Sequence, residues 1–261
     1  MHTLTASDGV ELAYRTFGTG STSVVLVHGW MMSGAVYDDL VAALGNEGVR
    51  WIVPDLRGTG RSGSADGTYT IEQYAKDVIA VADAAGASTF AVVGHSMGGQ
   101  IAQFIAATWP DRVIGAALLC PVPASGMTLP DDARGLFFTS GQNREMQKTI
   151  LGLACKDLSE AARERMLDDA GKITPECIQG AFTAWTGARF DDKLGAIRAP
   201  VLVVGTDDPF LPQEFLRAAV ASKIKRASLV YLPGPGHYPG AERPRETAAI
   251  LRAFLAPLLQ G

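Results

Sequence analysis

The chain has 261 residues, of which 47% are hydrophobic and 19% are charged, and its formal net charge is −4. This charge gives no electrostatic field that would attract polyanions, so nucleic acid is not expected as a partner. The length suits one large domain, or one domain with an inserted subdomain. The sequence has no run of about 18 apolar residues and no N-terminal secretion signal, so we expect a cytoplasmic protein with no membrane contact. Its three cysteines are widely spaced, and we expect them to be free thiols.

Strand and helix patterns alternate along most of the chain. Alternating residues in 3–6 and 11–17, on either side of Asp8-Gly9, predict a β-hairpin. Six short apolar runs are typical of strands buried on both faces of a parallel sheet: 24–27, 49–53, 89–93, 114–120, 201–204 and 228–232. Helical periodicity occupies intervals such as 71–85 and 247–258. This order predicts an α/β fold with a mostly parallel sheet.

The interval from Val122 to Phe190 breaks this alternation. It has no strand signal, but amphipathic helical patterns begin near Asp131, Ser159 and Thr174, each with a residue suited to cap a helix. We interpret residues 122–190 as a helical cap inserted into a core formed by residues 1–121 and 191–261.

The segment Gly94-His95-Ser96-Met97-Gly98 carries the clearest chemical signal. It joins a predicted strand to a helical pattern running from Gln100 to Trp109, so Ser96 would occupy a sharp turn where neighbouring backbones come close. Glycines two positions before and after the serine meet that steric demand, and Gly99 would let the helix pack close to the strands. The alternative is a serine that only caps a buried helix.

This segment resembles the nucleophile elbow, G-x-S-x-G, of the α/β-hydrolase family. Three further motifs resemble the family's in chain order: the His28-Gly29 oxyanion loop, the D-x-R-G-x-G-x-S loop at 55–62, and the G-H-x(4)-E-x-P segment at 236–244. The resemblance spans nearly the whole chain. It implies an α/β-hydrolase sheet with an N-terminal antiparallel hairpin and an inserted helical cap.

No cofactor and no metal are expected. The run from Gly58 to Gly63 matches the dinucleotide fingerprint G-x-G-x-x-G, but it lacks the strand and helix that this fingerprint needs directly on either side. The cysteines do not have the spacing of a zinc site, and the adjacent aspartate pairs have no histidine nearby.

A serine hydroxyl needs a base to remove its proton as it attacks. His237 lies in the loop PGPGHYPG after the last predicted strand, where it can reach over the carboxyl edge of the sheet. His2 belongs to the terminal strand, His28 to the loop after the first parallel strand, and His95 should point across its strand away from Ser96. We therefore predict that His237 is the base.

The acid that orients this base follows a late strand in the family, in the chain order Ser, Asp, His. Two neighbouring aspartates compete for the role. Asp208 fits the family pattern G-x-x-D-x-x-x-P with Gly205 and Pro212, so we choose it, with Asp207 as the alternative.

The main-chain N–H of Met97 and, by the resemblance, that of Trp30 are the predicted oxyanion-hole donors. The Trp30 side chain would either line the acyl pocket or simply pack. Most cap aromatics are expected to be packing residues, but five side chains are pocket candidates: Trp30, Phe137, Phe138, Trp185 and Tyr238. A cap rich in such residues suits a small or medium uncharged ester or lactone.

These residues predict a serine hydrolase of a carboxylic ester or lactone with an acyl-Ser96 intermediate. Two alternatives with the same residues remain from the resemblance: a cofactor-free haloperoxidase or perhydrolase, in which hydrogen peroxide attacks the acyl-enzyme, and a carbon–carbon bond hydrolase or cofactor-independent dioxygenase. A non-catalytic small-molecule receptor is a further alternative, which the complete set Ser96, Asp208 and His237 disfavours. The sequence predicts no oligomeric state.

Overall fold

The computed structural model describes residues 1–46, 48–64 and 68–259; residues 47, 65–67, 260 and 261 of the predicted core lie outside the described part. One mixed sheet contains eight strands: β1 (His2–Thr5), β2 (Glu11–Phe17), β3 (Thr22–Val27), β4 (Val49–Pro54), β5 (Phe90–His95), β6 (Val113–Leu119), β7 (Val201–Thr206) and β8 (Ala227–Leu232). Their order is β1-β2-β4-β3-β5-β6-β7-β8. The β1–β2 and β2–β4 pairs are antiparallel and the other pairs parallel, which confirms the predicted sheet.

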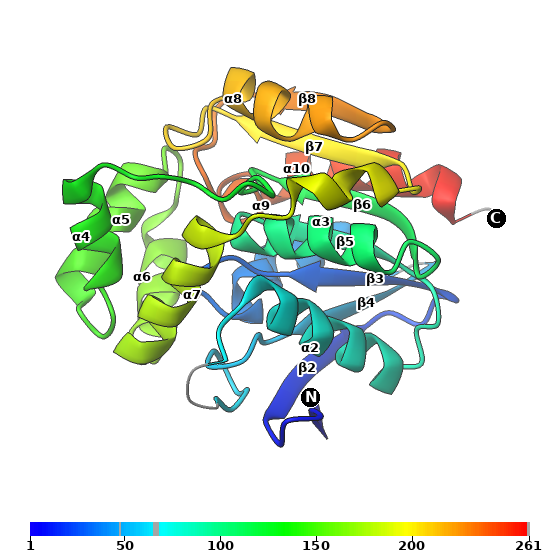
Figure 1. The fold of residues 1–261 in the computed structure, drawn as a ribbon, viewed down its shortest axis with the longest axis horizontal. Helices are drawn as coiled ribbons and strands as arrows, with labels where there is room; N and C mark the ends of the chain where they lie inside the picture. Colours follow the sequence, from blue (N-terminus) through cyan, green and yellow to red (C-terminus); the bar gives the residue numbers. More distant parts are fainter. Residues whose placement is uncertain (47, 65–67, 260–261) are drawn as a thin grey trace.

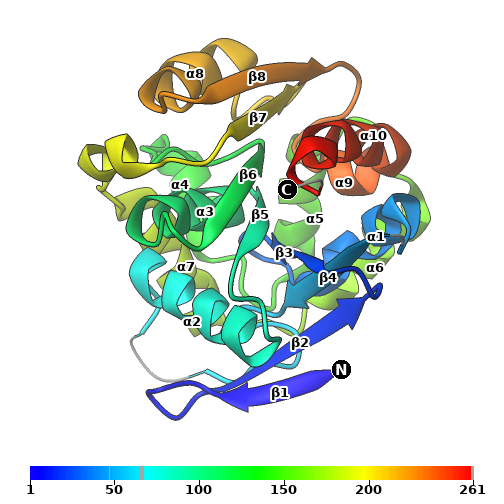
Figure 2. The ribbon, with the colours of Figure 1, turned by 90° about the vertical axis from the view of Figure 1, so that its right-hand side faces the viewer.

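Helices cover both faces of the sheet (Figure 2). One face packs against α2 (Ile71–Ala84) and α3 (Met97–Thr108), and the other against α1 (Asp38–Leu44) and α10 (Pro244–Leu255). The helices α8 (Gln213–Ala219) and α9 (Pro239–Glu242) complete the core. Successive residues of β3 enter opposite layers: Val25 and Val27 join one apolar cluster, Val24 and Leu26 the other. This two-sided burial explains the unbroken apolar runs. No helix within the described ranges is long and apolar enough to cross a bilayer.

Four α-helices lie between β6 and β7: α4 (Asp131–Phe138), α5 (Arg144–Ala154), α6 (Glu160–Ala170) and α7 (Pro175–Gly187). Figure 1 shows them together beyond the carboxyl ends of the parallel strands, so the helical insertion is confirmed. Ser159 and Thr174 cap α6 and α7 through their side chains, as predicted. Asp131 instead occupies the first turn of α4, after Pro130, and the start of α5 at the Asn143 cap was not predicted.

Candidate active site

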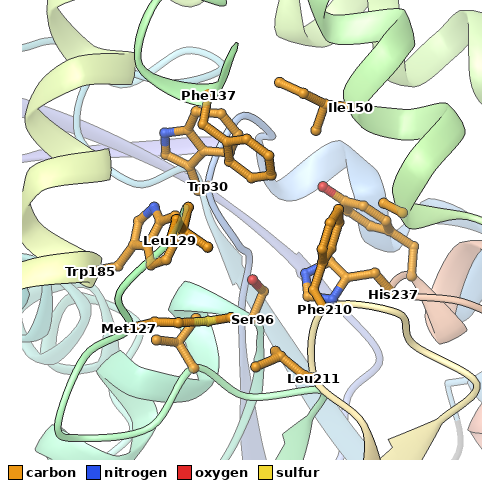
Figure 3. A pocket seen from close by; sticks show the side chains of 13 residues that line it. Trp30, Ser96, Met127, Leu129, Phe137, Ile150, Trp185, Phe210, Leu211 and His237 are labelled. Carbon is orange, nitrogen blue, oxygen red and sulfur yellow. The ribbon is translucent and has the colours of Figure 1, made fainter. Parts of the chain in front are cut away.

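The turn between β5 and α3 holds Ser96 in a strained conformation. Its φ of 55° and ψ of −119° are unfavourable for a residue with a side chain. The surrounding main chain enforces this geometry: Ser96 N donates to Leu119 O at 3.0 Å, and Ser96 O accepts from Gly99, Gln100 and Val122. The side chain makes no capping hydrogen bond to α3, and it points into a cavity lined partly by the helical insertion (Figure 3).

Glycines at this turn allow three segments to meet. A Cβ added to Gly94 would lie 2.2 Å from Gly98 O, and one added to Gly98 would lie 2.0 Å from Val27 O at the end of β3. Gly99 in turn faces Pro121, just beyond β6. Each distance is far below van der Waals contact, so only glycine permits this close approach of α3 to the sheet, as the sequence indicated.

His237 and Asp208 form a buried pair next to the same cavity. His237 Nδ1 donates to Asp208 Oδ2 at 2.6 Å. Burial raises the pKa of Asp208, but His237 and the main-chain N–H groups of Phe210 and Leu211 outweigh it, so the pKa stays below the ordinary value. The carboxylate is therefore ionised at neutral pH and holds the proton on Nδ1, which leaves Nε2 free to act as a base.

Asp207 points elsewhere. Its carboxylate accepts hydrogen bonds from the Tyr231 hydroxyl and from Gly234 N, both outside the cavity. No hydrogen bond links it to His237 among the described residues. The geometry thus brings Asp208, and not its neighbour, to the histidine.

Two contacts anchor the main chain of His237. His95 Nε2 donates to His237 O at 2.7 Å, and His237 N donates to Ala154 O at 2.8 Å. Burial lowers the pKa of His95 to about 3, so its ring stays neutral and keeps one N–H for this bond. His95 is not among the described residues that line the cavity with Ser96; it supports the loop that carries His237, a role that no sequence signal indicated.

Glu242 holds this loop from the other side. Its Oε2 accepts from Lys156 N, Asp157 N and Gly236 N at 2.8, 2.8 and 2.9 Å, and its Oε1 accepts from Tyr238 N at 3.0 Å. One buried carboxylate thus ties the histidine loop to the end of α5. The signal for this residue was the E of the G-H-x(4)-E-x-P segment, whose function the sequence left unassigned.

The loop of Gly29 and Trp30 lies directly beside the turn that holds Ser96. A Cβ on Gly29 would lie 3.1 Å from Ser96 Cβ, which shows how close the two segments are. Within the described residues, neither Trp30 N nor Met97 N donates to a protein acceptor. Two free N–H groups near Ser96 are what an oxyanion needs.

The cavity over Ser96 has a volume of about 50 Å³ and is almost entirely apolar. Of the five predicted pocket side chains, Phe138 does not line it but packs edge-on against Phe182 at 5.9 Å. The other four do, and seven further residues complete the wall beside Ser96 and His237: Val122, Met127, Leu129, Ile150, Ala154, Phe210 and Leu211 (Figure 3). Phe210 and Leu211 directly follow the Asp208 turn, a position from which they could have been predicted.

Trp30 both lines the cavity and packs. Its Nε1 donates to Ile178 O at 2.9 Å, and its ring stacks on Phe137 with centroids 5.2 Å apart. The packing role is therefore confirmed, and the side chain also forms part of the cavity wall beside Ser96.

Ser96 and His237 line the same cavity but are not hydrogen-bonded to each other within the described residues. No hydrogen bond joins Ser96 Oγ to His237 Nε2 within the described residues, whereas the sequence led us to expect contact. Such bonds are often long in free enzymes and tighten when substrate binds. Rotation of the Ser96 side chain about its Cα–Cβ bond changes the direction of the hydroxyl without disturbing the backbone.

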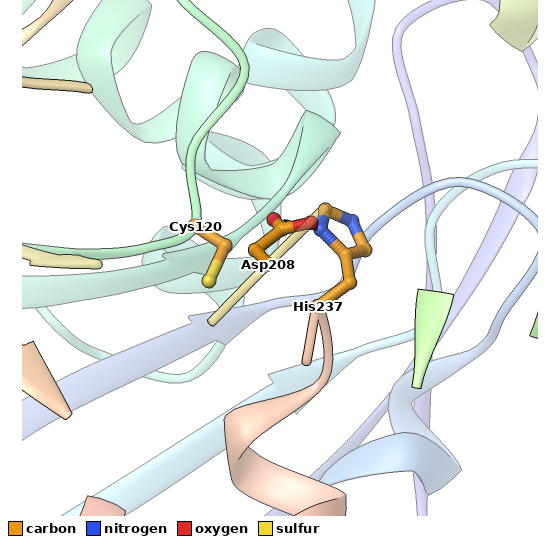
Figure 4. A group of neighbouring side chains, drawn as sticks. All are labelled: Cys120, Asp208 and His237. Carbon is orange, nitrogen blue, oxygen red and sulfur yellow. Dashed lines mark hydrogen bonds and ion pairs between the residues drawn. The ribbon is translucent and has the colours of Figure 1, made fainter. Parts of the chain in front are cut away.

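Cys120 lies beside the acid–base pair (Figure 4). Its Sγ, a carboxylate oxygen of Asp208 and a ring nitrogen of His237 lie within 4.8 Å of one another, a set of donors that could hold a metal ion. Burial raises the pKa of the Cys120 thiol well above its ordinary value, so the thiolate that a metal requires is disfavoured. The sulfur instead lies 3.3 Å from Thr206 Oγ1, and the other two groups already bond to each other.

Comparison with known proteins agrees with this architecture. A model of the alpha/beta hydrolase family matches residues 24–250. A non-heme haloperoxidase of Rhodococcus erythropolis is 28% identical, and the match covers 90% of this chain and 92% of the haloperoxidase. A bifunctional esterase/perhydrolase of Acinetobacter calcoaceticus is 27% identical, and that match also covers 90% of this chain and 92% of the relative. The structure of Est816, described as an N-acyl homoserine lactone degrading enzyme, is 28% identical with a TM-score of 0.79 over 96% of this chain and 99% of its own. The chain therefore belongs to the α/β hydrolase family.

Proposed function

We propose that this chain is a serine hydrolase that cleaves a small or medium apolar carboxylic ester or lactone through an acyl-Ser96 intermediate. The observation that carries the proposal is the 2.6 Å bond from His237 to Asp208, beside the cavity into which the strained turn presents Ser96. Residues 122–190 would serve as the cap that closes this cavity.

In the proposed reaction, Ser96 Oγ attacks the carbonyl carbon while His237 Nε2 takes its proton. Asp208 stabilises the imidazolium, and the N–H groups of Trp30 and Met97 bind the oxyanion, each donor contributing roughly 3–4 kcal/mol to transition-state stabilisation. The intermediate collapses, the C–O bond breaks, and the leaving alkoxide takes the proton from Nε2. Water then attacks the acyl-enzyme with His237 again as base, which releases the carboxylic acid and restores Ser96.

The size of the cavity favours short acyl groups. A volume of about 50 Å³ accommodates roughly three to five water-sized groups, which is close to an acetyl or propionyl chain. Longer chains would need the apolar wall to move. We therefore expect kcat/KM for p-nitrophenyl esters to fall from acetate through butyrate to hexanoate.

Turnover of this ester series by the wild type, Ser96→Ala and the control Ser222→Ala tests the proposal. Ser222 is an exposed residue whose hydroxyl donates to Ala218 O, four positions earlier in the chain, so its variant should behave as the wild type. Loss of the nucleophile should lower kcat by a factor on the order of 10⁴ or more. Phenylmethylsulfonyl fluoride should inactivate the enzyme and add its mass to the Ser96 peptide. Equal turnover in wild type and Ser96→Ala would refute the serine mechanism.

Perhydrolysis is a second candidate that the same site supports. The names of the two curated relatives, a haloperoxidase and an esterase/perhydrolase, favour it, as does a cavity of acetyl size. Here hydrogen peroxide, in place of water, would attack acyl-Ser96, with His237 accepting its proton, and a peracid would leave. Peroxide-dependent bromination of monochlorodimedone in acetate buffer measures this activity, and Ser96→Ala should abolish it. If bromination is absent while esters are hydrolysed, only the hydrolase proposal stands.

A further inference from the structure

The peptide group that precedes His237 is hydrogen-bonded at both of its polar atoms. Its N–H, which belongs to His237, donates to Ala154 O at 2.8 Å. Its carbonyl oxygen, which belongs to Gly236, accepts from the Oγ1 hydroxyl of Thr206 at 2.7 Å. The peptide group after His237 is held at both of its polar atoms by two other buried side chains. The backbone of His237 is therefore fixed from both sides, and Thr206 supplies one of the four contacts.

Thr206 also holds the turn that carries Asp208. It is the last residue of β7, and its Oγ1 accepts a hydrogen bond from Asp208 N at 3.2 Å. A hydroxyl has one proton to donate, and here that proton points to Gly236 O, so Cys120 Sγ, 3.3 Å away, is the donor in the third contact. One hydroxyl thus joins the turn of Asp208 to the residue directly before His237, across 30 positions of the chain.

Other contacts link the same two segments, but they lie farther from the acid–base pair. Asp207 N donates to Pro235 O at 3.1 Å, and the Asp207 carboxylate adds a contact to the same loop. By contrast, Thr206 bonds to the peptide group of His237 itself and to the N–H of Asp208. The Thr206 side chain is 2% exposed, so water cannot take over its contacts if a methyl group replaces the hydroxyl.

We infer that Thr206 is a positioning residue whose hydroxyl sets the alignment of His237 with Asp208. The inference rests on the proposed function, in which these two residues are the base and the acid. A shift of either segment changes the 2.6 Å bond between His237 Nδ1 and Asp208 Oδ2 and turns Nε2 relative to Ser96. Thr206 is not among the described residues that line the cavity, so the loss of its hydroxyl should lower kcat and leave substrate binding unchanged.

Substitutions that separate the hydroxyl from the rest of the side chain test this inference. Thr206→Val keeps the shape and removes the hydroxyl, whereas Thr206→Ser keeps the hydroxyl and removes the methyl group. Thr247→Val is the matched control: Thr247 is also buried, and its hydroxyl donates to Pro239 O at 2.8 Å. This variant loses the same kind of bond, but the bond does not reach either residue of the acid–base pair. Each protein is assayed with p-nitrophenyl acetate and unfolded by heat.

We expect Thr206→Val to lower kcat about 10- to 100-fold while KM stays within about two-fold of wild type, since a misplaced catalytic group costs rate and not binding. Thr206→Ser should keep kcat within about three-fold of wild type, and Thr247→Val should leave it unchanged although both valine variants lose similar thermal stability. If Thr206→Val keeps its kcat, or if Thr206→Ser loses as much, the hydroxyl does not position the pair and the inference is wrong. Should Thr206→Val fail to fold, Thr206→Ala takes its place, because it differs from Thr206→Ser only in the hydroxyl.

A second measurement does not depend on ester hydrolysis. The proton on His237 Nδ1 lies in a short hydrogen bond to a carboxylate, so its ¹H NMR resonance is expected far downfield, and its loss in Asp208→Asn assigns it. The resonance should persist in Thr206→Ser and Thr247→Val, and it should broaden or move upfield in Thr206→Val. If it is the same in Thr206→Val as in wild type, the inference is overturned whatever the activity. If wild type hydrolyses no ester, the proposed function fails, and the resonance alone decides whether Thr206 aligns the pair.

Discussion

Replacement of Glu242 by glutamine tests how the histidine loop is held. The Glu242 side chain is buried, and its two oxygens accept four main-chain N–H groups, three at Oε2 and one at Oε1. Glutamine has the same shape but only one acceptor oxygen. If that oxygen takes the Oε2 position, the amide NH₂ points at the N–H of Tyr238, and the opposite orientation leaves three donors unpaired. No rotamer satisfies all four.

The magnitude follows from these contacts. An unpaired buried donor costs about 1–3 kcal/mol, and three bonds that lose their charged acceptor each weaken by roughly half. Because neighbouring effects do not simply add, we expect Glu242→Gln to lower the free energy of unfolding by about 2–4 kcal/mol. The altered loop also carries His237, and a displacement of about 1 Å at a catalytic group can cost on the order of 10²-fold in rate. We therefore expect kcat to fall 10- to 100-fold, with the acid–base pair still present.

Denaturant unfolding and p-nitrophenyl acetate kinetics measure the two effects. Glu246→Gln is the matched control, since Glu246 lies on the surface and its contact with Arg243 is 3.7 Å long. That variant should differ from wild type by no more than about 0.5 kcal/mol and keep full kcat. If Glu242→Gln behaves like Glu246→Gln in both assays, the carboxylate does not hold the loop and this reasoning is refuted.

Two further predictions concern Asp208, the proposed acid, and the turn that holds Ser96. Burial raises the pKa of Asp208, but His237 and main-chain N–H groups lower this pKa more. The ionised carboxylate therefore stabilises the folded protein at pH values above the ordinary pKa of about 4, and this stabilisation is lost as the pH falls below that value. Asp208→Asn should flatten this acid limb in pH-dependent unfolding and lower kcat by a factor on the order of 10³–10⁴, whereas Asp207→Asn should leave kcat unchanged. Gly98→Ala should prevent folding or cost more than about 3 kcal/mol in denaturant unfolding, because its Cβ would lie 2.0 Å from a carbonyl oxygen. Gly152 lies in α5, and no atom lies within 4 Å of a Cβ placed there. Gly152→Ala should therefore raise the free energy of unfolding by about 0.5–1 kcal/mol.

The parts of the fold that the sequence predicted well are those set by local sterics and burial. The strands were recognised because both faces of the sheet are covered, and the nucleophile turn because Gly94 and Gly98 stand at positions where a Cβ would collide with a carbonyl oxygen. The preference for Asp208 over Asp207 came from the family pattern alone, since both follow the same strand. Only the path of the loop after β7 shows that the first aspartate turns outward to Tyr231.

Contacts between residues far apart in the chain were harder to predict from the sequence. Nothing local in the sequence reports that Glu242 accepts from Lys156 and Asp157, which precede it by 86 and 85 positions. The same holds for Phe138, an aromatic residue next to a true cavity residue on α4. A helix turns about 100° per residue, so Phe137 faces the cavity while Phe138 faces Phe182.

Within the described residues, the helical insertion, residues 122–190, is hydrogen-bonded to three of the four segments that carry a proposed catalytic group, the exception being the segment of Asp208. One bond starts in the oxyanion loop, one in the helix after the nucleophile and one in the histidine loop: Trp30 Nε1 to Ile178 O, Gln100 Nε2 to Trp185 O, and His237 N to Ala154 O. A cap that lifted as a rigid lid would break all three and disturb the alignment of the site. If the proposed function holds, we therefore expect substrate to enter through small movements of side chains in the cavity wall, and the size of the cavity to limit the acyl group.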